Sequence, residues 1–119
     1  MSCSVFHLTS AATTNLTQLG VGHTQLYGYS IVNTAATALF VKFYWGAPGT
    51  FSGGGDLPTV GTDIPALTVG IPTVSTLTLS YNEPIAGEGN LFMATTVNAA
   101  DTDATAVAAG NLIMSILIG

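Results

Sequence analysis

Few residues in this sequence could carry out acid–base or metal chemistry. His7 and His23 are the only histidines, and their spacing matches no metal-binding motif such as HExxH. Asp101 and Asp103 occupy alternate positions, so both carboxylates could point at one hard cation such as Ca²⁺. Two carboxylates are too few ligands by themselves, and a helix cap or a turn explains the pair better. We therefore expect neither a metal nor a cofactor.

The patterns that could indicate catalysis are equally weak. Glu83 and Glu88 could form the carboxylate pair of a glycosidase, but their surroundings are rich in Pro, Gly and Asn, where solvated charges are the better explanation. No serine lies in a GxSxG motif, and the glycines at positions 53–55 are not followed by GK[ST]. The sequence therefore predicts a protein that is not an enzyme.

The composition narrows the partners that such a protein could bind. A chain of 119 residues is long enough for one domain, which we place over residues 1–119. Charged residues make up 6% of the chain, against about a quarter in ordinary globular proteins. Lys42 is the only basic residue, which argues against binding to nucleic acid or to an anionic membrane. A surface so poor in charge predicts burial against other copies, and hence a homo-oligomer.

Sequence features at the two ends of the chain bear on its location. The first residues lack both a basic region and a sustained apolar run, so we expect no signal peptide. Cys3 is the only cysteine, which excludes an intrachain disulfide. The most apolar run, residues 112–118, is shorter than the roughly 20 residues of a membrane-spanning helix and predicts a buried strand. We expect the chain to be made and kept in the cytoplasm.

The elements that position these residues centre on residues 24–45, which contain the only tryptophan. Apolar side chains alternate along both halves of this stretch, which is typical of strands. The short polar and small residues at 33–37 suit a chain reversal, so we predict a β-hairpin. The alternating residues are Tyr27, Tyr29 and Ile31 in the first half and Leu39, Val41, Phe43 and Trp45 in the second.

The opposite face of the second half carries the candidate contact residues Phe40, Lys42 and Tyr44. A lone cation on a strand needs a carboxylate partner, within the chain or across an interface. Alternatively, its stem covers the sheet while its amine reaches water. The Gly- and Pro-rich stretch 46–58 predicts a long surface loop, and we add its Phe51 to the candidate subunit contacts.

Further strands are predicted at residues 3–9, 65–71, 77–81, 91–97 and 112–118, with a loop at 82–90. Residues 10–22 fit either an irregular strand or a loop, and residues 98–110 fit either a short helix or an ordered loop. Thr76, Thr78 and Ser80 form an outward set of hydroxyls of the kind that covers β-rich interfaces. Seven or eight strands with at most one short helix predict an all-β fold, an antiparallel β-sandwich of jelly-roll type.

Three segments of the chain form a pattern of order and spacing: SAATTN with YGYSIVNTAATALFVKFY, then PTVGTDIPALTVGIP, then AADTDATAVAAGNL. This pattern resembles the small capsid cement or decoration proteins of tailed bacteriophages. The resemblance implies a virion protein that is assembled in the host cytoplasm and stabilises the phage head from the outer capsid surface. It further implies a trimer that binds the major capsid protein.

A second function stays open beside the structural one. A β-sandwich with Tyr and Trp exposed on one face would favour a carbohydrate- or receptor-binding module of a phage tail or fibre. A glycan array separates the two interpretations.

Overall fold

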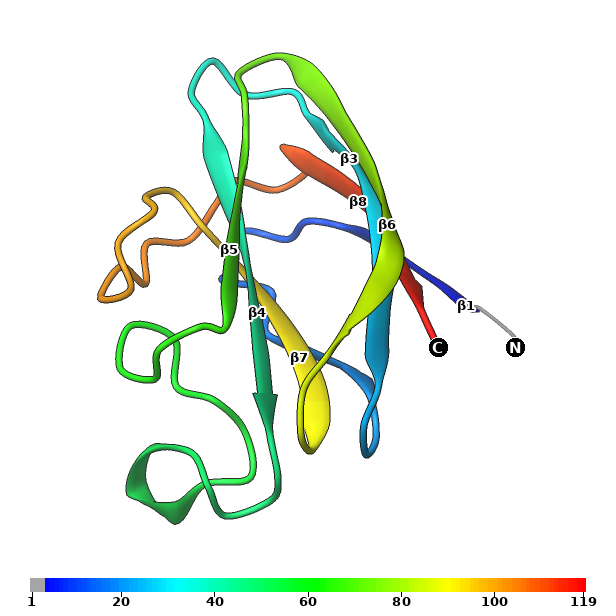
Figure 1. The fold of residues 1–119 in the computed structure, drawn as a ribbon. Coiled ribbons are helices and arrows are strands. Elements are labelled where there is room, and N and C mark those ends of the chain that lie inside the picture. The colour runs from blue at the N-terminus through cyan, green and yellow to red at the C-terminus, as the bar shows by residue number, and fades with distance from the viewer. Residues whose placement is uncertain (1–3) are drawn as a thin grey trace.

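The computed structural model describes residues 4–119, which form a sandwich of two antiparallel sheets (Figure 1). One sheet has the strand order β1-β8-β3-β6 and the other has the order β2-β7-β4-β5. The strands are β1 (Ser4–Thr9), β2 (Thr17–Gly20), β3 (Gln25–Asn33), β4 (Leu39–Gly46), β5 (Leu67–Ile71), β6 (Ser75–Ala86), β7 (Asn90–Thr96) and β8 (Leu112–Ile118). Cys3, placed in the first strand by the sequence, lies outside the described residues.

The connections between the strands confirm the predicted fold class. Every pair of consecutive strands except β4 and β5 crosses from one sheet to the other, which is the eight-stranded jelly-roll arrangement. The one helical segment of the described residues is a single 3₁₀ turn, η1 (Ser52–Gly54). Residues 98–110 form an ordered loop, not the alternative short helix. Residues 4–119 contain no helix that is long and apolar enough to cross a membrane.

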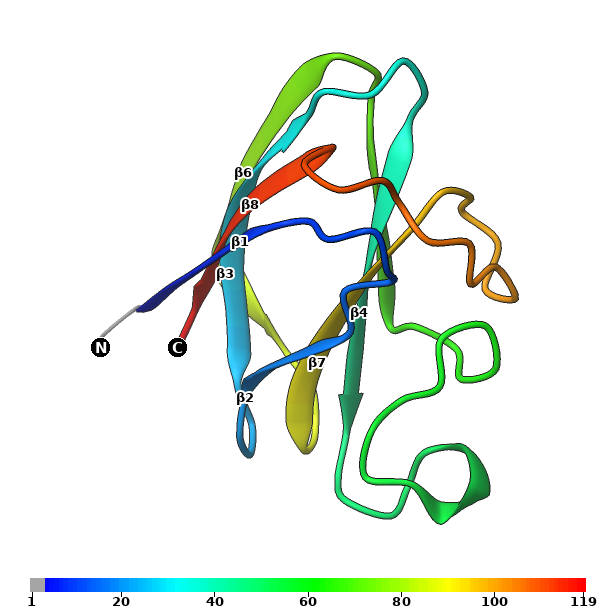
Figure 2. The same cartoon turned by 180° about the vertical axis from the view of Figure 1, so that it is seen from behind.

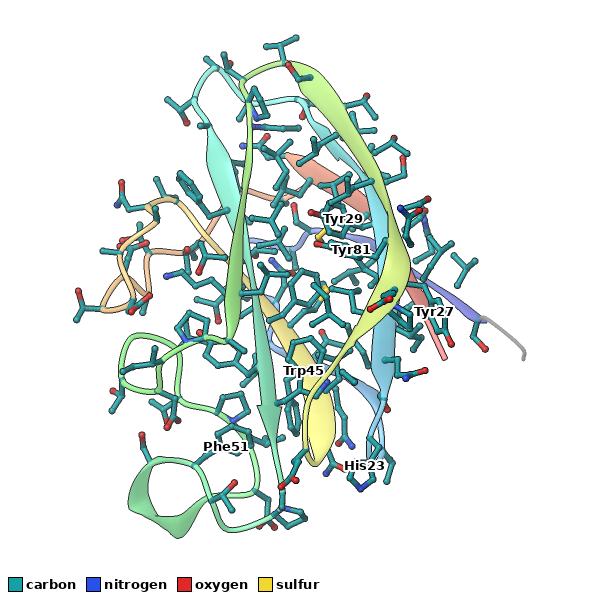
Figure 3. The ribbon with its side chains drawn as sticks, viewed as in Figure 1. His23, Tyr27, Tyr29, Trp45, Phe51 and Tyr81 are labelled. Carbon is teal, nitrogen blue, oxygen red and sulfur yellow. The ribbon has the colours of Figure 1, made fainter. Side chains whose placement is uncertain are left out.

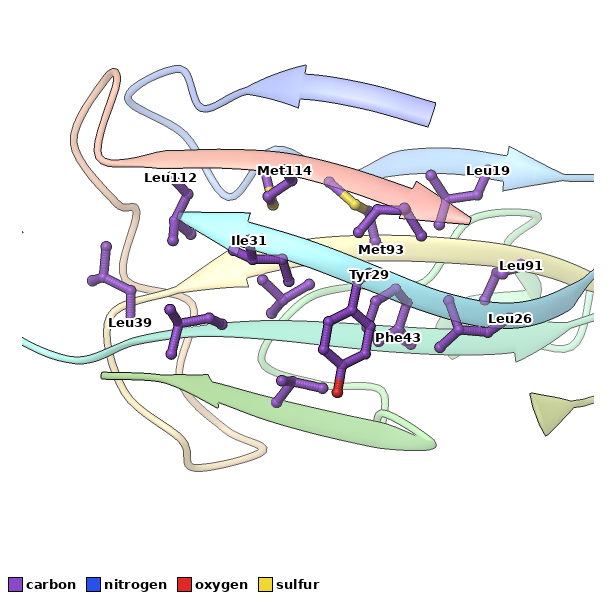
Figure 4. Packing of buried hydrophobic residues seen from close by; sticks show 14 of the residues in the cluster. Leu19, Leu26, Tyr29, Ile31, Leu39, Phe43, Leu91, Met93, Leu112 and Met114 are labelled. Carbon is purple, nitrogen blue, oxygen red and sulfur yellow. The ribbon is translucent and has the colours of Figure 1, made fainter. Parts of the chain in front are cut away.

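The core lies between the two sheets and is built by alternate residues of the long strands (Figure 4). Ile31 on β3, Phe43 on β4 and Met114 on β8 are fully buried there. Trp45 lies at one end of this core, where its Nε1 donates a hydrogen bond of 2.8 Å to the carbonyl oxygen of Thr24. The inward alternation predicted for Leu39, Val41 and Phe43 is therefore observed.

The predicted hairpin at residues 24–45 is wrong, because its two strands lie in different sheets. The side chain of Asn33, at the end of β3, redirects the connection across the sandwich. Its Nδ2 donates to the carbonyl oxygens of Thr37 at 2.9 Å and Ile71 at 3.1 Å, and its Oδ1 accepts from the Ala35 N–H at 2.8 Å. These bonds replace the ladder that a hairpin would have formed at this point.

A β-bulge in β3 interrupts the alternation predicted for its tyrosines. The strand register shifts between Leu26 and Gly28 against both neighbouring strands. Leu26 is consequently the buried residue, and Tyr27 projects from the outer side of the sheet (Figure 3). Its hydroxyl donates to Gln25 Oε1 at 3.0 Å. A bulge of this kind adds one residue to the strand, so all side chains before it change face.

Two further boundaries differ from those expected. Part of residues 10–22 forms the short strand β2, and a loop held by Asn15 precedes it; the Asn15 Nδ2 donates to Thr95 Oγ1 at 2.8 Å. The predicted loop at 82–90 begins later, because β6 continues to Ala86 and pairs there with Gln25.

Candidate functional site

The predicted contact residues Phe40, Lys42 and Tyr44 lie on the outer face of the β2-β7-β4-β5 sheet. Two long connections cover this face, residues 47–66 and residues 97–111, which we call the 47–66 loop and the 97–111 loop. In Figure 1 they lie outside β4 and β7, on the side away from the other sheet. Lys42 and Tyr44 are 0% and 1% exposed, and Phe40 is half-buried.

Lys42 holds the 97–111 loop against the sheet. Its Nζ donates hydrogen bonds to the carbonyl oxygens of Ala100 at 2.6 Å and Asp103 at 3.2 Å. Burial lowers the pKa of Lys42, while the negative charges of Asp103 and Asp101 act in the opposite direction. The expected carboxylate partner of Lys42 is therefore wrong, as is the alternative of an amine that reaches water: two backbone carbonyl groups accept its hydrogen bonds, and the carboxylates of Asp103 and Asp101 act through their charge.

Asp103 fixes the shape of the 97–111 loop from within. Its carboxylate accepts from the Asn98 N–H at 3.0 Å and from the Thr105 hydroxyl at 2.7 Å. Burial acts to raise the pKa of Asp103, but the hydrogen bonds from Thr105 and Asn98 outweigh it and leave the pKa lowered. Turn formation, the preferred explanation of the Asp101–Asp103 pair, thus accounts for the hydrogen bonds that Asp103 accepts.

The 47–66 loop packs on the same face through a second, smaller apolar cluster. Phe51 from the loop meets Phe92 of β7 edge to face, with ring centroids 5.5 Å apart. Tyr44 completes the cluster from β4. Gly46 permits this approach, because a Cβ atom there would collide with the ring of Phe51. Phe51 is 9% exposed and serves the chain's own packing.

Asp63 anchors the 47–66 loop in the way that Asp103 anchors the other. Its carboxylate accepts from the Ser52 hydroxyl at 2.8 Å and from the Thr59 N–H at 2.7 Å. Burial acts to raise the pKa of Asp63, but the hydrogen bonds from Thr59 and Ser52 outweigh it and leave the pKa lowered.

The hydroxyl of Tyr44 is the one buried side-chain polar atom of the described residues without a hydrogen-bond partner. Burial, followed by the charges of Asp63 and Asp101, raises the pKa of Tyr44 to about 12. A neutral phenol in this position forgoes a hydrogen bond that water would supply in the unfolded chain.

Three of the four predicted contact residues, Lys42, Tyr44 and Phe51, therefore lie beneath or within the loops of their own chain, and Phe40 is half-buried on the same face. A subunit contact through Lys42 or Tyr44 would require the covering loops to move, so their role in assembly stays a prediction. Residues 4–119 form no pocket and contain no group of three or more possible metal ligands. The candidate site that we consider is an exposed surface.

The outer face of the β1-β8-β3-β6 sheet is such a surface, and loops do not cover it (Figure 2). The strand register places His7, Ser115, Ser30 and Thr78 in one row across all four strands. His7 Nδ1 lies 3.1 Å from Ser115 Oγ, and Ser30 Oγ lies 3.1 Å from Thr78 Oγ1. Hydrogen bonds between neighbouring side chains thus hold this row in place.

Apolar and hydroxyl side chains form the rows on either side. Val5, Leu117, Gly28 and Ser80 form one row, and Thr9, Ile113, Val32 and Thr76 form the other. None of the residues in these rows is Asp, Glu, Lys or Arg. We call these three rows the uncharged face. Four of the six acidic residues lie in the two loops on the opposite side of the molecule: Asp56, Asp63, Asp101 and Asp103.

Sequence reasoning found only one edge of the uncharged face. The outward hydroxyls of Thr76, Thr78 and Ser80 were predicted, and all three are exposed. Ser30 and Ser115 were missed, because their position in the same row depends on a register that joins distant strands. Their placement between apolar residues at alternate positions was the available signal.

The fold of this chain is that of a jelly-roll sandwich, and one solved structure shows the same arrangement over nearly the whole chain. The crystal structure of PirA matches 94% of this chain and 92% of its own, with a TM-score of 0.50 and 14% sequence identity. At this identity the similarity establishes the fold alone. No protein-family model matches the sequence, and no curated protein is significantly similar to it.

The resemblance to phage capsid cement proteins is therefore wrong, and the phage tail or fibre alternative falls with it. The match over nearly the whole chain is to PirA, and no comparison supports a capsid family. Of the segments that suggested the resemblance, residues 10–15, 58–66 and 99–111 lie in loops, and residues 27–44 lie mostly in β3 and β4. Turn residues in loops and alternating residues in strands are common to β-sandwiches in general. That resemblance implied three further properties: a capsid protein as partner, a trimer and a location in the virion. Without the resemblance, these three properties have no support.

Proposed function

We propose that this chain is a non-catalytic binding subunit, which assembles with a second, different protein through the uncharged face. The observation that carries the proposal is the face itself. It is a four-stranded surface that mixes apolar and hydroxyl side chains and lacks formal charge, although the chain has acidic residues to place there. Charged side chains are depleted at the centres of protein interfaces.

The distribution of charge supports the same proposal. Four of the six acidic residues lie in the 47–66 loop and the 97–111 loop, on the opposite side of the molecule. They would therefore be directed away from the partner.

The position of Ser30 at the centre of the face suggests a direct test. The chain is isolated gently from its native host, and its mass is measured by native mass spectrometry. We expect a complex with one second protein in a fixed ratio. Ser30→Lys places a charge in the middle of the contact, so binding to the isolated partner should weaken by about tenfold or more.

Thr102→Lys provides the matched control. Thr102 is exposed on the 97–111 loop, so the substitution adds the same charge outside the uncharged face. It should leave partner binding unchanged. The proposal is overturned if no second protein is present in a fixed ratio, or if folded Ser30→Lys binds as tightly as the wild type. Binding to glycans alone would also overturn it.

A further inference from the structure

Strand β1 is an unprotected sheet edge. It lies at the end of the order β1-β8-β3-β6, so one side of its backbone has no neighbouring strand (Figure 2). Its residues, SVFHLT, include no Lys, Arg, Asp, Glu, Pro or Gly. Natural proteins usually protect such edges with charges, prolines, bulges or very short strands, because open edges pair with other chains.

Two of the other three edges carry one of these protective features within the strand. β6 contains Glu83 and Pro84. β2 has four residues and a register shift between Gln18 and Gly20. β5 has five residues, which include Gly70 but no charge or proline, and is followed directly by Pro72. Among the edge strands of the described residues, β1 is the longest that contains no charged residue, proline or register shift.

The pairing with β8 determines which backbone groups of β1 point outward. The Ser10 N–H donates to the Leu112 carbonyl oxygen at 2.8 Å, so Ser10 faces β8. Because hydrogen-bonded positions alternate along an antiparallel pair, Leu8 and Phe6 also face β8. The N–H and C=O groups of Val5, His7 and Thr9 therefore point away from the sheet.

We propose that a second copy of this chain occupies this edge, with the two β1 strands antiparallel and the two-fold axis at His7. In this register His7 lies opposite His7 of the other copy, and Val5 lies opposite Thr9. Each of these residues then exchanges two hydrogen bonds with its counterpart. A shift of the axis to Phe6 or Leu8 would leave part of these groups unpaired.

The side chains on the core side of β1 fit the same register. Phe6 and Leu8 point toward the core but remain half-buried, because they lie at the open side of the sandwich. With the axis at His7, Phe6 of one copy lies directly opposite Leu8 of the other, where an aromatic–aliphatic pair is favourable. The strand is thus complementary to itself in both backbone and side chains, which identifies the occupant as a second copy.

A disulfide trap tests this register. In the Cys3→Ser background, His7→Cys places two thiols opposite each other with Cα atoms about 5.5 Å apart, which suits a disulfide. Val5→Cys is the matched control on the same strand and face. Its two thiols would be about 13 Å apart along the strands and cannot bond.

We expect mild oxidation to convert His7→Cys into a disulfide-linked dimer on a non-reducing gel, while Val5→Cys remains monomeric. Equal amounts of dimer from both variants, or dimer from neither, would overturn the proposal. A 1:1 mixture of Val5→Cys and Thr9→Cys should form the mixed dimer, which confirms the register independently.

A backbone block provides the second measurement. His7→Pro removes an outward N–H without removing a bond to β8, so a folded chain should lose the concentration-dependent dimer in sedimentation velocity. Val21→Lys is the control, since Val21 is 77% exposed and lies in the connection between β2 and β3, outside β1. It should dimerise as the wild type does. A wild-type chain that is monomeric at all concentrations overturns self-pairing and leaves the proposed second protein untouched.

Discussion

The two outer faces of this sandwich begin from the same strand geometry and end in different environments. On the β2-β7-β4-β5 sheet, the outward residues Lys42, Tyr44 and Phe92 are all buried beneath the chain's own loops. On the β1-β8-β3-β6 sheet, the outward residues Ser30, Thr78 and His7 face solvent in part or in full. The first face is an internal core, and the second is available to other molecules.

The difference shows that strand alternation alone does not identify the surface of a sandwich. Both faces display a period of two, and both include aromatic or apolar side chains. The path of the long loops decides between them, because the 47–66 loop, which joins β4 to β5, and the 97–111 loop, which joins β7 to β8, both fold over the β2-β7-β4-β5 sheet. Loops that return to a sheet must be held there, and Lys42, Asp63 and Asp103 provide the necessary hydrogen bonds.

The largest expected effect comes from emptying the covered face. Phe92→Ala removes a fully buried ring that packs against Phe51, so it should reduce the free energy of unfolding by about 3–5 kcal/mol. Val32→Ala on the uncharged face, where the side chain is half-buried, should cost far less. Urea denaturation of both variants makes the comparison. Equal losses would mean that the loops do not create a second core.

Lys42→Met should have the next largest effect. Methionine preserves the stem but leaves the carbonyls of Ala100 and Asp103 without their donor, at a cost of about 1–3 kcal/mol. The 97–111 loop should also exchange its amide hydrogens faster, which hydrogen-exchange mass spectrometry detects. Because apolar replacements of buried charges are sometimes neutral, an unchanged stability and unchanged exchange would show that the loop is held without Lys42.

Acid should weaken the attachment of the 47–66 loop through Asp63. The pKa of Asp63 is lower in the folded chain than in the unfolded chain, where it is near 4. The ionised carboxylate therefore stabilises the fold above the unfolded pKa, and this stabilisation is lost as the pH falls through the folded pKa. Asp63→Asn should therefore cost about 1 kcal/mol at pH 7, a small value because the group is partly exposed.

The pH dependence supplies the control for this variant. The difference between Asp63→Asn and the wild type should shrink as the pH falls below about 4, since protonation removes the same charge. Urea denaturation at several pH values measures it. A difference that stays constant from pH 7 to pH 3 would contradict the role assigned to the carboxylate.

The fold class was predictable because it depends on local periods. The alternation of Leu39, Val41 and Phe43, and the apolar run from Leu112 to Ile118, each indicate strands without reference to the rest of the chain. The hairpin prediction failed because the choice of sheet depends on Asn33. The side-chain amide of Asn33 donates a hydrogen bond to the carbonyl oxygen of Ile71 across the sandwich. A contact between residues so distant in sequence leaves no periodic signal.

The site was less predictable, for a related reason. Phe40, Lys42 and Tyr44 were identified correctly as one face of a strand, but nothing local shows that two loops cover it. The row of His7, Ser115, Ser30 and Thr78 joins four strands from distant parts of the sequence. A face assembled in this way requires the register of every strand, and the bulge at Tyr27 changes that register; the isolated Gly28 was the sequence signal for it.

The smallest expected effect is the removal of the unpartnered hydroxyl of Tyr44. Tyr44→Phe deletes a buried polar atom that makes no hydrogen bond, so it should raise the free energy of unfolding by up to about 1 kcal/mol. Tyr29→Phe is the matched control, because the Tyr29 hydroxyl lies 3.3 Å from that of Tyr81, and its loss should destabilise the chain slightly. Thermal denaturation of both variants compares them. If Tyr44→Phe destabilises the chain as Tyr29→Phe does, a bound water satisfies the Tyr44 hydroxyl, and the covered face is wetter than an internal core.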